Sequence, residues 1–162
     1  FINLAIREYK KIIELLKTET DLKNPLRQNL EIVLRIIFSV FGDHFAIFLT
    51  ISHFMAQKII HYPQADTEDG SDSILIGNFK CAFEEVTDVI VKIIENARKR
   101  GEINSPLESD ALSKMFGSLI KGVIFEWKLS GKIGDTEKAI YEILTFIEQG
   151  FGLSLLPYRG EK

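Results

Sequence analysis

With 162 residues, 46% of them hydrophobic and 27% charged, the chain has the composition of a folded globular domain, which excludes a disordered or fibrous protein. Its net charge of −3 leaves no excess of positive charge for binding a nucleic-acid backbone. The single cysteine, Cys81, excludes an internal disulfide framework and a zinc site built on cysteines, and it fits a cytoplasmic protein. The longest uncharged apolar stretch, residues 44–57, is too short to span a bilayer, so we expect no membrane segment.

Apolar residues in the first part of the chain recur at spacings of three and four, which predicts amphipathic helices. The first helix is expected over residues 1–17 and is followed by a polar linker. Asn24-Pro25 suits the N-cap and first position of a second helix, which we expect to end at Gly42. Asp43 is expected to cap a third helix that runs to about His61 and is apolar over most of its circumference.

Residues 62–73 include a proline, a glycine and four acidic residues, and they predict a long solvated loop. A fourth helix is expected to start at Ser73 and to end in the basic run 98–100, whose cations suit the helix dipole, before a left-handed Gly101. The pattern Ser105-Pro106-Leu107-Glu108 is a capping box and predicts a fifth helix over 106–130. Asp135 is expected to cap a sixth helix that ends near residue 152. The prediction is therefore an all-α chain with one domain, residues 1–156, and a loose tail, residues 157–162.

Three segments in a fixed order resemble the regulatory region of TetR/AcrR-family transcriptional regulators. Residues 94–103 end in a basic residue followed by Gly-Glu-Ile, as the seventh helix of the family does. Residues 112–127 are rich in small residues, like the eighth helix, and residues 143–151 look like the ninth, which often ends in an apolar run and a glycine. The resemblance spans nearly the whole chain. It implies a six-helix domain that binds a small effector and forms a homodimer through a four-helix bundle. Operator DNA would be contacted only by an N-terminal helix-turn-helix head, which would precede Phe1 and is absent from this chain.

Aromatic residues fall on four successive predicted helices, and most of them are expected to form ordinary core. The resemblance implies that some of them, together with a few polar groups, line an effector cavity. No buried carboxylate or lysine can be picked out opposite the predicted helix 43–61, which favours a neutral, mainly apolar effector. The candidate lining residues are Phe48, Ser52, His53, Phe79, Phe83, Ile120 and Trp127.

Small residues on the predicted helix 106–130 recur on one side, where they let another helix approach closely. That neighbour is either a helix of the same chain or, as we expect from the resemblance, the same helix of a second subunit. The last helix is expected to join this twofold interface. The candidate interface residues are Ala111, Met115, Ser118, Gly122, Ile143 and Ile147.

The sequence contains no recognisable pattern for catalysis, for a cofactor or for a metal. His44, His53 and His61 are nine and eight residues apart, which does not stack them as zinc ligands on a helix. No glycine-rich phosphate loop and no Gly-x-Ser-x-Gly elbow is present. We therefore expect a ligand-responsive repressor domain and not an enzyme. The alternative is a helical small-molecule carrier or protein-interaction module without a role on DNA.

Overall fold

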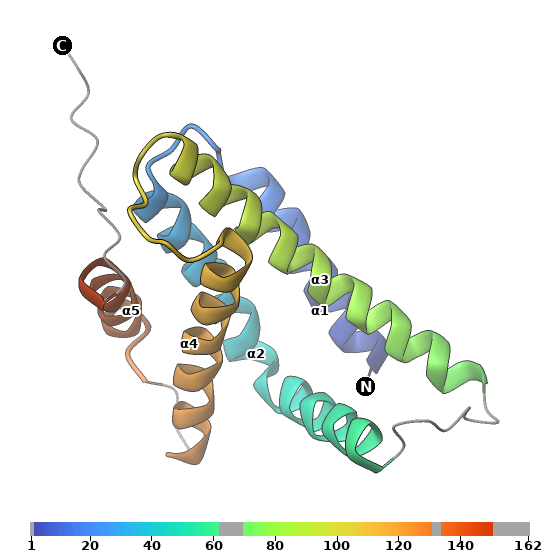
Figure 1. The fold of residues 1–162 in the computed structure, drawn as a ribbon. Coiled ribbons are helices and arrows are strands. Elements are labelled where there is room, and N and C mark those ends of the chain that lie inside the picture. Colours follow the sequence, from blue (N-terminus) through green and yellow to red (C-terminus); the bar gives the residue numbers. More distant parts are fainter. Residues whose placement is uncertain (1, 62–69, 131–133, 151–162) are drawn as a thin grey trace.

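The computed structural model describes residues 2–61, 70–130 and 134–150, with the stretches 47–61 and 70–76 described as helical backbone only (Figure 1). The described elements are five α-helices: α1 (Ile2–Glu19), α2 (Leu26–His61), α3 (Gly70–Lys99), α4 (Ser109–Leu129) and α5 (Thr136–Gly150). The all-α prediction is confirmed. Residues 62–69 of the expected loop lie outside the described residues, as does the expected tail, and α3 already begins at Gly70 and not at Ser73.

The prediction of six helices is wrong in number, because the expected second and third helices form one element. α2 has 36 residues and bends at His44, whose φ of −127° and ψ of 21° are not helical. Gly42 was expected to end the helix, but among the described glycines Gly101 is the one with the positive φ that commonly ends a helix. Without that reversal the chain resumes a helical path after the bend. The sequence thus predicts the position of an interruption near residues 42–43, but not that it is a bend within one helix.

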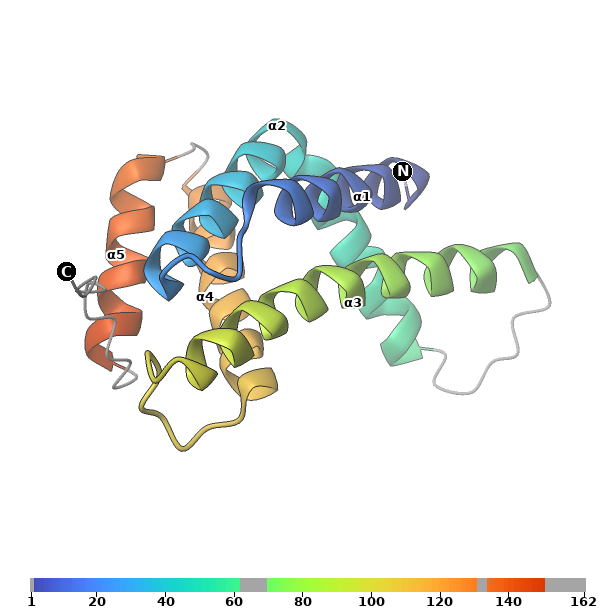
Figure 2. The ribbon, with the colours of Figure 1, turned by 90° about the horizontal axis from the view of Figure 1, so that it is seen from above.

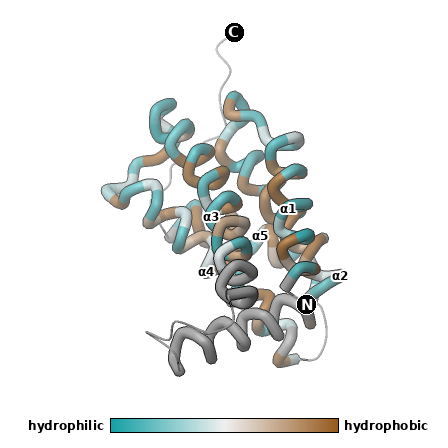
Figure 3. The backbone as a smooth tube through the Cα atoms, turned by 90° about the vertical axis from the view of Figure 1, so that its right-hand side faces the viewer, coloured by the Kyte–Doolittle hydropathy of each residue, from teal (hydrophilic) through white to brown (hydrophobic). Residues whose placement is uncertain are grey.

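α1 packs along both α2 and α3, and α4 packs against the C-terminal part of α3. Figure 2 shows α4 and α5 together at one end of the molecule, with α1 and the long α3 extending away from them. Hydrophobic and hydrophilic residues alternate along α1 and the coloured part of α3, as expected for helices with one buried side (Figure 3). Side chains from all five helices form one buried cluster, and its members with less than 2% exposure include Ile12, Leu16, Leu34, Ile93 and Leu144.

The end of α3 has the predicted glycine stop. Gly101 has a φ of 76°. The N–H of Glu102 donates to the carbonyl of Ala97 at 3.0 Å, and the N–H of Gly101 donates to the carbonyl of Arg98 at 3.0 Å. This pair of bonds is a Schellman motif. The arginines here do more than face the helix dipole: Arg98 donates to the carbonyl of Ser105 at 2.8 Å, and Arg100 donates to that of Asn24 at 2.8 Å. They therefore fix the loops that follow α3 and α1.

Among the starts of α2, α4 and α5, one agrees with the sequence and two differ. Asp135 accepts the N–H of Lys138 at 3.1 Å, so the predicted cap of α5 is confirmed. At α2, the N–H of Leu26 donates to Glu102 Oε2 at 2.6 Å, so the capping acceptor comes from the segment after α3 and not from Asn24. α4 begins at Ser109, three residues after the capping-box prediction, because Arg98 binds the carbonyls of the 105–107 segment outside the helix.

Candidate functional site

An aromatic cluster lies where α1, α2 and α3 meet, and Tyr9 of α1 is its centre. The Tyr9 ring is 6.2 Å from Phe41 of α2, 5.3 Å from Phe79 and 6.1 Å from Phe83 of α3, measured between centroids. All three contacts are edge-to-face, the geometry that the ring quadrupoles favour. Tyr9 is buried, which raises the pKa of its phenol and keeps the group neutral at physiological pH.

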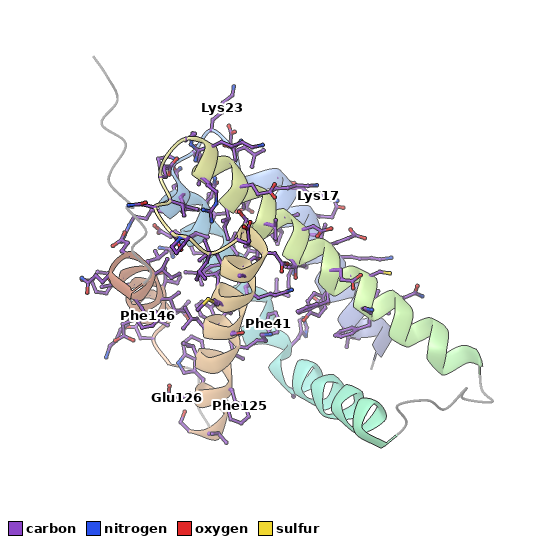
Figure 4. The ribbon with its side chains drawn as sticks, viewed as in Figure 1. Lys17, Lys23, Phe41, Phe125, Glu126 and Phe146 are labelled. Carbon is purple, nitrogen blue, oxygen red and sulfur yellow. The ribbon has the colours of Figure 1, made fainter. Side chains whose placement is uncertain are left out.

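The cluster extends from the core to the surface. Tyr9 is 8% exposed, Phe41 and Phe79 are half-buried, and Phe83 is 41% exposed. Figure 4 places Phe41 beside the bend of α2. Lys121 of α4 lies with its Nζ 5.7 Å from the centre of the Phe83 ring, within the range of a cation–π contact. The outer face of the cluster is therefore able to accept a cation.

A buried carboxylate lies next to this cluster in the chain. Glu8 is 4% exposed, and its Oε1 accepts bonds from Nε and Nη2 of Arg7 at 3.3 Å and 3.2 Å. Its Oε2 has no hydrogen-bond partner in the described part of the chain. Oε2 lies 3.7 Å from Nε2 of His44, the residue at the bend of α2. Glu8 is thus a buried carboxylate beside His44, which corrects the premise that none lies opposite the predicted helix 43–61.

The sequence contains a signal for Glu8 that the apolar stripe of α1 obscures. Two rows of α1 are buried, because the helix packs against both α2 and α3. One row carries Ile6, Tyr9 and Ile13, and the other carries Ala5, Ile12 and Leu16. Glu8 falls between Ala5 and Ile12 in the second row, at spacings of three and four. A single acid in an otherwise apolar row is recognised as buried only when it is known that other helices pack on both rows. The sequence alone does not show this.

The predicted cavity residues fall into three groups. Phe79 and Phe83 lie together in the Tyr9 cluster. Trp127 lies in a different contact, 5.1 Å from the ring of Phe38, and Ile120 is a buried core residue of α4. The remaining candidates are on α2 beyond the bend, where side chains lie outside the described residues: Phe48, Ser52 and His53.

A separate apolar pocket lies between the start of α2, the end of α3, and helices α4 and α5. Its volume is about 20 Å³, and Leu30, Ile94, Phe116 and Ile147 are among its lining residues. That volume is close to the minimum for a single water molecule. The pocket is therefore a packing defect in this conformation and not a site for a small organic ligand.

α4 carries an uncovered apolar stripe. Its side chains follow each other at spacings of four and three, as in a coiled-coil seam. Ala111 is half-buried, while Met115, Ser118 and Gly122 are exposed, and a Cβ added to Gly122 would meet nothing within 4 Å. The spacing continues to two large residues that the sequence prediction did not include, Phe125 and Leu129, which are 53% and 73% exposed. We call the six residues the α4 stripe: Ala111, Met115, Ser118, Gly122, Phe125 and Leu129.

The α5 part of the predicted interface requires correction. Ile143 and Ile147 are 5% and 4% exposed and lie in the core of the same chain, because α5 docks on α2 through this side. Two ion pairs, Arg27–Glu148 and Arg35–Glu137, fasten the two helices together. The exposed aromatic side chains of α5 are instead Tyr141, at 63%, and Phe146, at 52%, and Figure 4 shows Phe146 on α5 and Phe125 on α4.

Comparison with family models, with curated proteins and with solved structures gives no match. In the part of the chain that the structure describes, no helix is long and apolar enough to cross a membrane. No group of three or more His, Cys, Asp or Glu side chains gathers among these residues in a way that would hold a metal ion. The candidate sites are therefore the aromatic cluster with Glu8 and the α4 stripe.

Proposed function

We propose that this chain is the effector-binding and dimerisation domain of a ligand-responsive transcriptional repressor of the TetR type. A small, mainly apolar molecule would bind between α1, α2 and α3, and two subunits would associate through α4 and α5. Operator DNA would be bound by a helix-turn-helix segment joined to α1, and the effector would change the spacing of the two DNA-binding segments. The observation that carries the proposal is the α4 stripe, an uncovered apolar seam on the helix that resembles the eighth helix of the family.

The α4 stripe is suited to pairing with a second copy of itself. Two small residues, Ser118 and Gly122, lie at its centre, next to the larger Met115 on one side and Phe125 on the other. About a twofold axis between Ser118 and Gly122, Met115 would face Phe125 of the partner subunit, and Ser118 would face Gly122 of the partner subunit. A closed twofold contact requires such self-complementarity, and the small side chains at the axis would let the two helices approach closely there. Tyr141 and Phe146 would extend the contact onto α5.

The effector role is supported by the contacts of α1. Tyr9 of α1 is the residue that links the aromatic side chains of α2 and α3, so a molecule inserted among these rings displaces α1 relative to both helices. An effector shifts such an arrangement only by binding one conformation more tightly than the other. α1 would transmit the displacement because the DNA-binding segment is proposed to join it.

Operator release is the experiment that tests the function. The intact protein is expected to bind a palindromic duplex specifically and to be released by an effector that this 162-residue chain also binds. The chain alone, with its net charge of −3, is expected not to shift the same duplex. If the intact protein shows no sequence-specific DNA binding over a range of salt concentrations, the repressor proposal fails, and a carrier or interaction module takes its place.

A further inference from the structure

Glu8 brings an incompletely satisfied charge into the interior. One carboxylate oxygen is bonded to Arg7, whose side chain is 71% exposed and therefore solvated, and the other oxygen has no donor in the described part of the chain. A buried carboxylate oxygen without a donor is energetically unfavourable, and a bound water, ion or ligand group is one way in which native structures satisfy such an atom. The orphaned oxygen, Oε2, points toward His44 at the bend of α2.

The separation of Glu8 Oε2 and His44 Nε2 defines the kind of group that fits. At 3.7 Å the two atoms are too far apart for a good hydrogen bond with each other, but one nitrogen can lie within hydrogen-bond distance of both. A protonated amine has at least two N–H donors and a positive charge, so it can donate to the carboxylate and to an imidazole nitrogen at once. A hydroxyl can also bridge the two groups, by accepting from an imidazole N–H and donating to the carboxylate, but it brings no charge to compensate the carboxylate.

The surroundings suit an amine that carries a hydrophobic body. The rings of Tyr9, Phe79 and Phe83 lead from the buried region next to Glu8 to the surface, and aromatic faces attract both hydrocarbon and cations. The ammonium of Lys121 over Phe83 is a cation already in such a position. Glu8 Oε2 is covered in this conformation, so the amine reaches it only when α1 and α2 move apart at the contact between Glu8 and His44.

We propose that Glu8 and His44 form the polar anchor for an amphiphilic amine, whose apolar body lies against the Tyr9 cluster. This inference rests on the proposed effector role and specifies the chemistry of the effector: an organic cation with an aromatic or aliphatic tail. Occupation of the anchor would require α1 and α2 to move apart at the contact between Glu8 and His44.

A matched pair of probes tests the anchor directly. 4-Phenylbutylamine and 4-phenylbutanol differ in the charged group but have the same tail, and their binding to the 162-residue chain is measured by calorimetry. The amine is expected to bind about tenfold or more tightly than the alcohol, as a charge-assisted hydrogen bond in a buried site provides. Glu8→Gln is expected to remove this preference and leave the affinity for the alcohol unchanged. Glu14→Gln, at an exposed position of the same helix, is the control and is expected to keep the preference.

His44→Ala provides a second variant in case Glu8→Gln does not fold, and it is expected to weaken the amine more than the alcohol. Equal affinity of the unaltered chain for the two probes, binding of neither probe, or an amine preference that survives Glu8→Gln would each overturn the anchor. Equal affinities would leave the apolar site and the repressor role standing, since operator release by the intact protein tests that role separately. Loss of the preference in Glu8→Gln alone, with Glu14→Gln unaffected, supports the anchor.

Discussion

At the scale of single residues, Gly134 is held close to an indole ring. A Cβ built on Gly134 would lie 2.9 Å from Cε2 and 3.0 Å from Cδ1 of Trp127, closer than carbon atoms approach without displacement. Trp127 in turn packs on Phe38, so the ring has little freedom to move away. We expect Gly134→Ala to lower the free energy of unfolding by about 1–3 kcal/mol through overpacking.

Urea denaturation measures this change, and Gly117→Ala is the matched control. Gly117 lies inside α4, and a Cβ there would meet nothing within 4 Å. Alanine has the higher helix propensity, so this control is expected to gain up to about 1 kcal/mol. A Gly134→Ala variant as stable as the unaltered chain would show that the Trp127 ring adjusts without cost.

Glu102, in the segment after α3, holds the start of α2 in place. It accepts the N–H of Leu26 at the start of α2 and is also paired with Arg100. Glu102→Ala is expected to lower the free energy of unfolding by about 1–2 kcal/mol, because the first turn of α2 loses its capping acceptor. Glu95→Ala, at an exposed position inside α3, is the control and is expected to change little. Equal effects of the two substitutions in thermal unfolding would contradict the capping role.

At the scale of whole elements, the docking of α5 on α2 is sensitive to acid. The hydrogen bond from Arg35 lowers the pKa of the Glu137 carboxyl, with Nη2 of Arg35 and Oε2 of Glu137 2.8 Å apart. A carboxyl whose pKa is lower in the folded state stabilises that state above the pKa of the unfolded chain, and the contribution is lost as pH falls through the folded pKa. Acidification below the ordinary range of glutamate is therefore expected to loosen α5.

Thermal midpoints across a pH series test the α5 contact. Glu137→Gln is expected to be less stable than the unaltered chain at neutral pH, and the difference is expected to vanish at acid pH. The effect is small because both partners are solvent-exposed. Glu142→Gln changes an acid on the same helix whose partner is Lys138 of α5 itself, so it is the control. A difference between Glu137→Gln and the unaltered chain that persists in acid would contradict the assignment.

The sequence predicts an element well where a local rule decides it. The Gly101 stop and the Asp135 cap depend on neighbouring residues alone, and both are confirmed. Periodicity alone does not distinguish a helix break from a bend, so α2 was divided in two. Three further features depend on contacts between distant segments: the cap from Glu102, the burial of Glu8 between two helices, and the inward side of α5 that holds Ile143. In the candidate site, the spacing of aromatic residues predicts Phe79 and Phe83. It does not predict that Tyr9 is the centre of the cluster or that Glu8 is buried beside it.

At the scale of the whole molecule, the α4 stripe leads to a prediction about assembly. Gly122 is at the proposed dyad and its side-chain position is open, so Gly122→Leu adds volume without disturbing the subunit that carries it. In a dimer the added side chain would lie against the partner subunit and wedge the helices apart at their closest point, a form of overpacking that costs about 1–3 kcal/mol. The dissociation constant is therefore expected to rise by about tenfold or more, and sedimentation velocity at micromolar concentrations measures it.

Gly77→Leu makes the same change at an open, exposed position of α3 and is expected to leave the association state unchanged. If the unaltered chain sediments as a monomer, or if both leucine variants behave alike, the α4 stripe is not the contact between subunits, and the repressor role loses its main support.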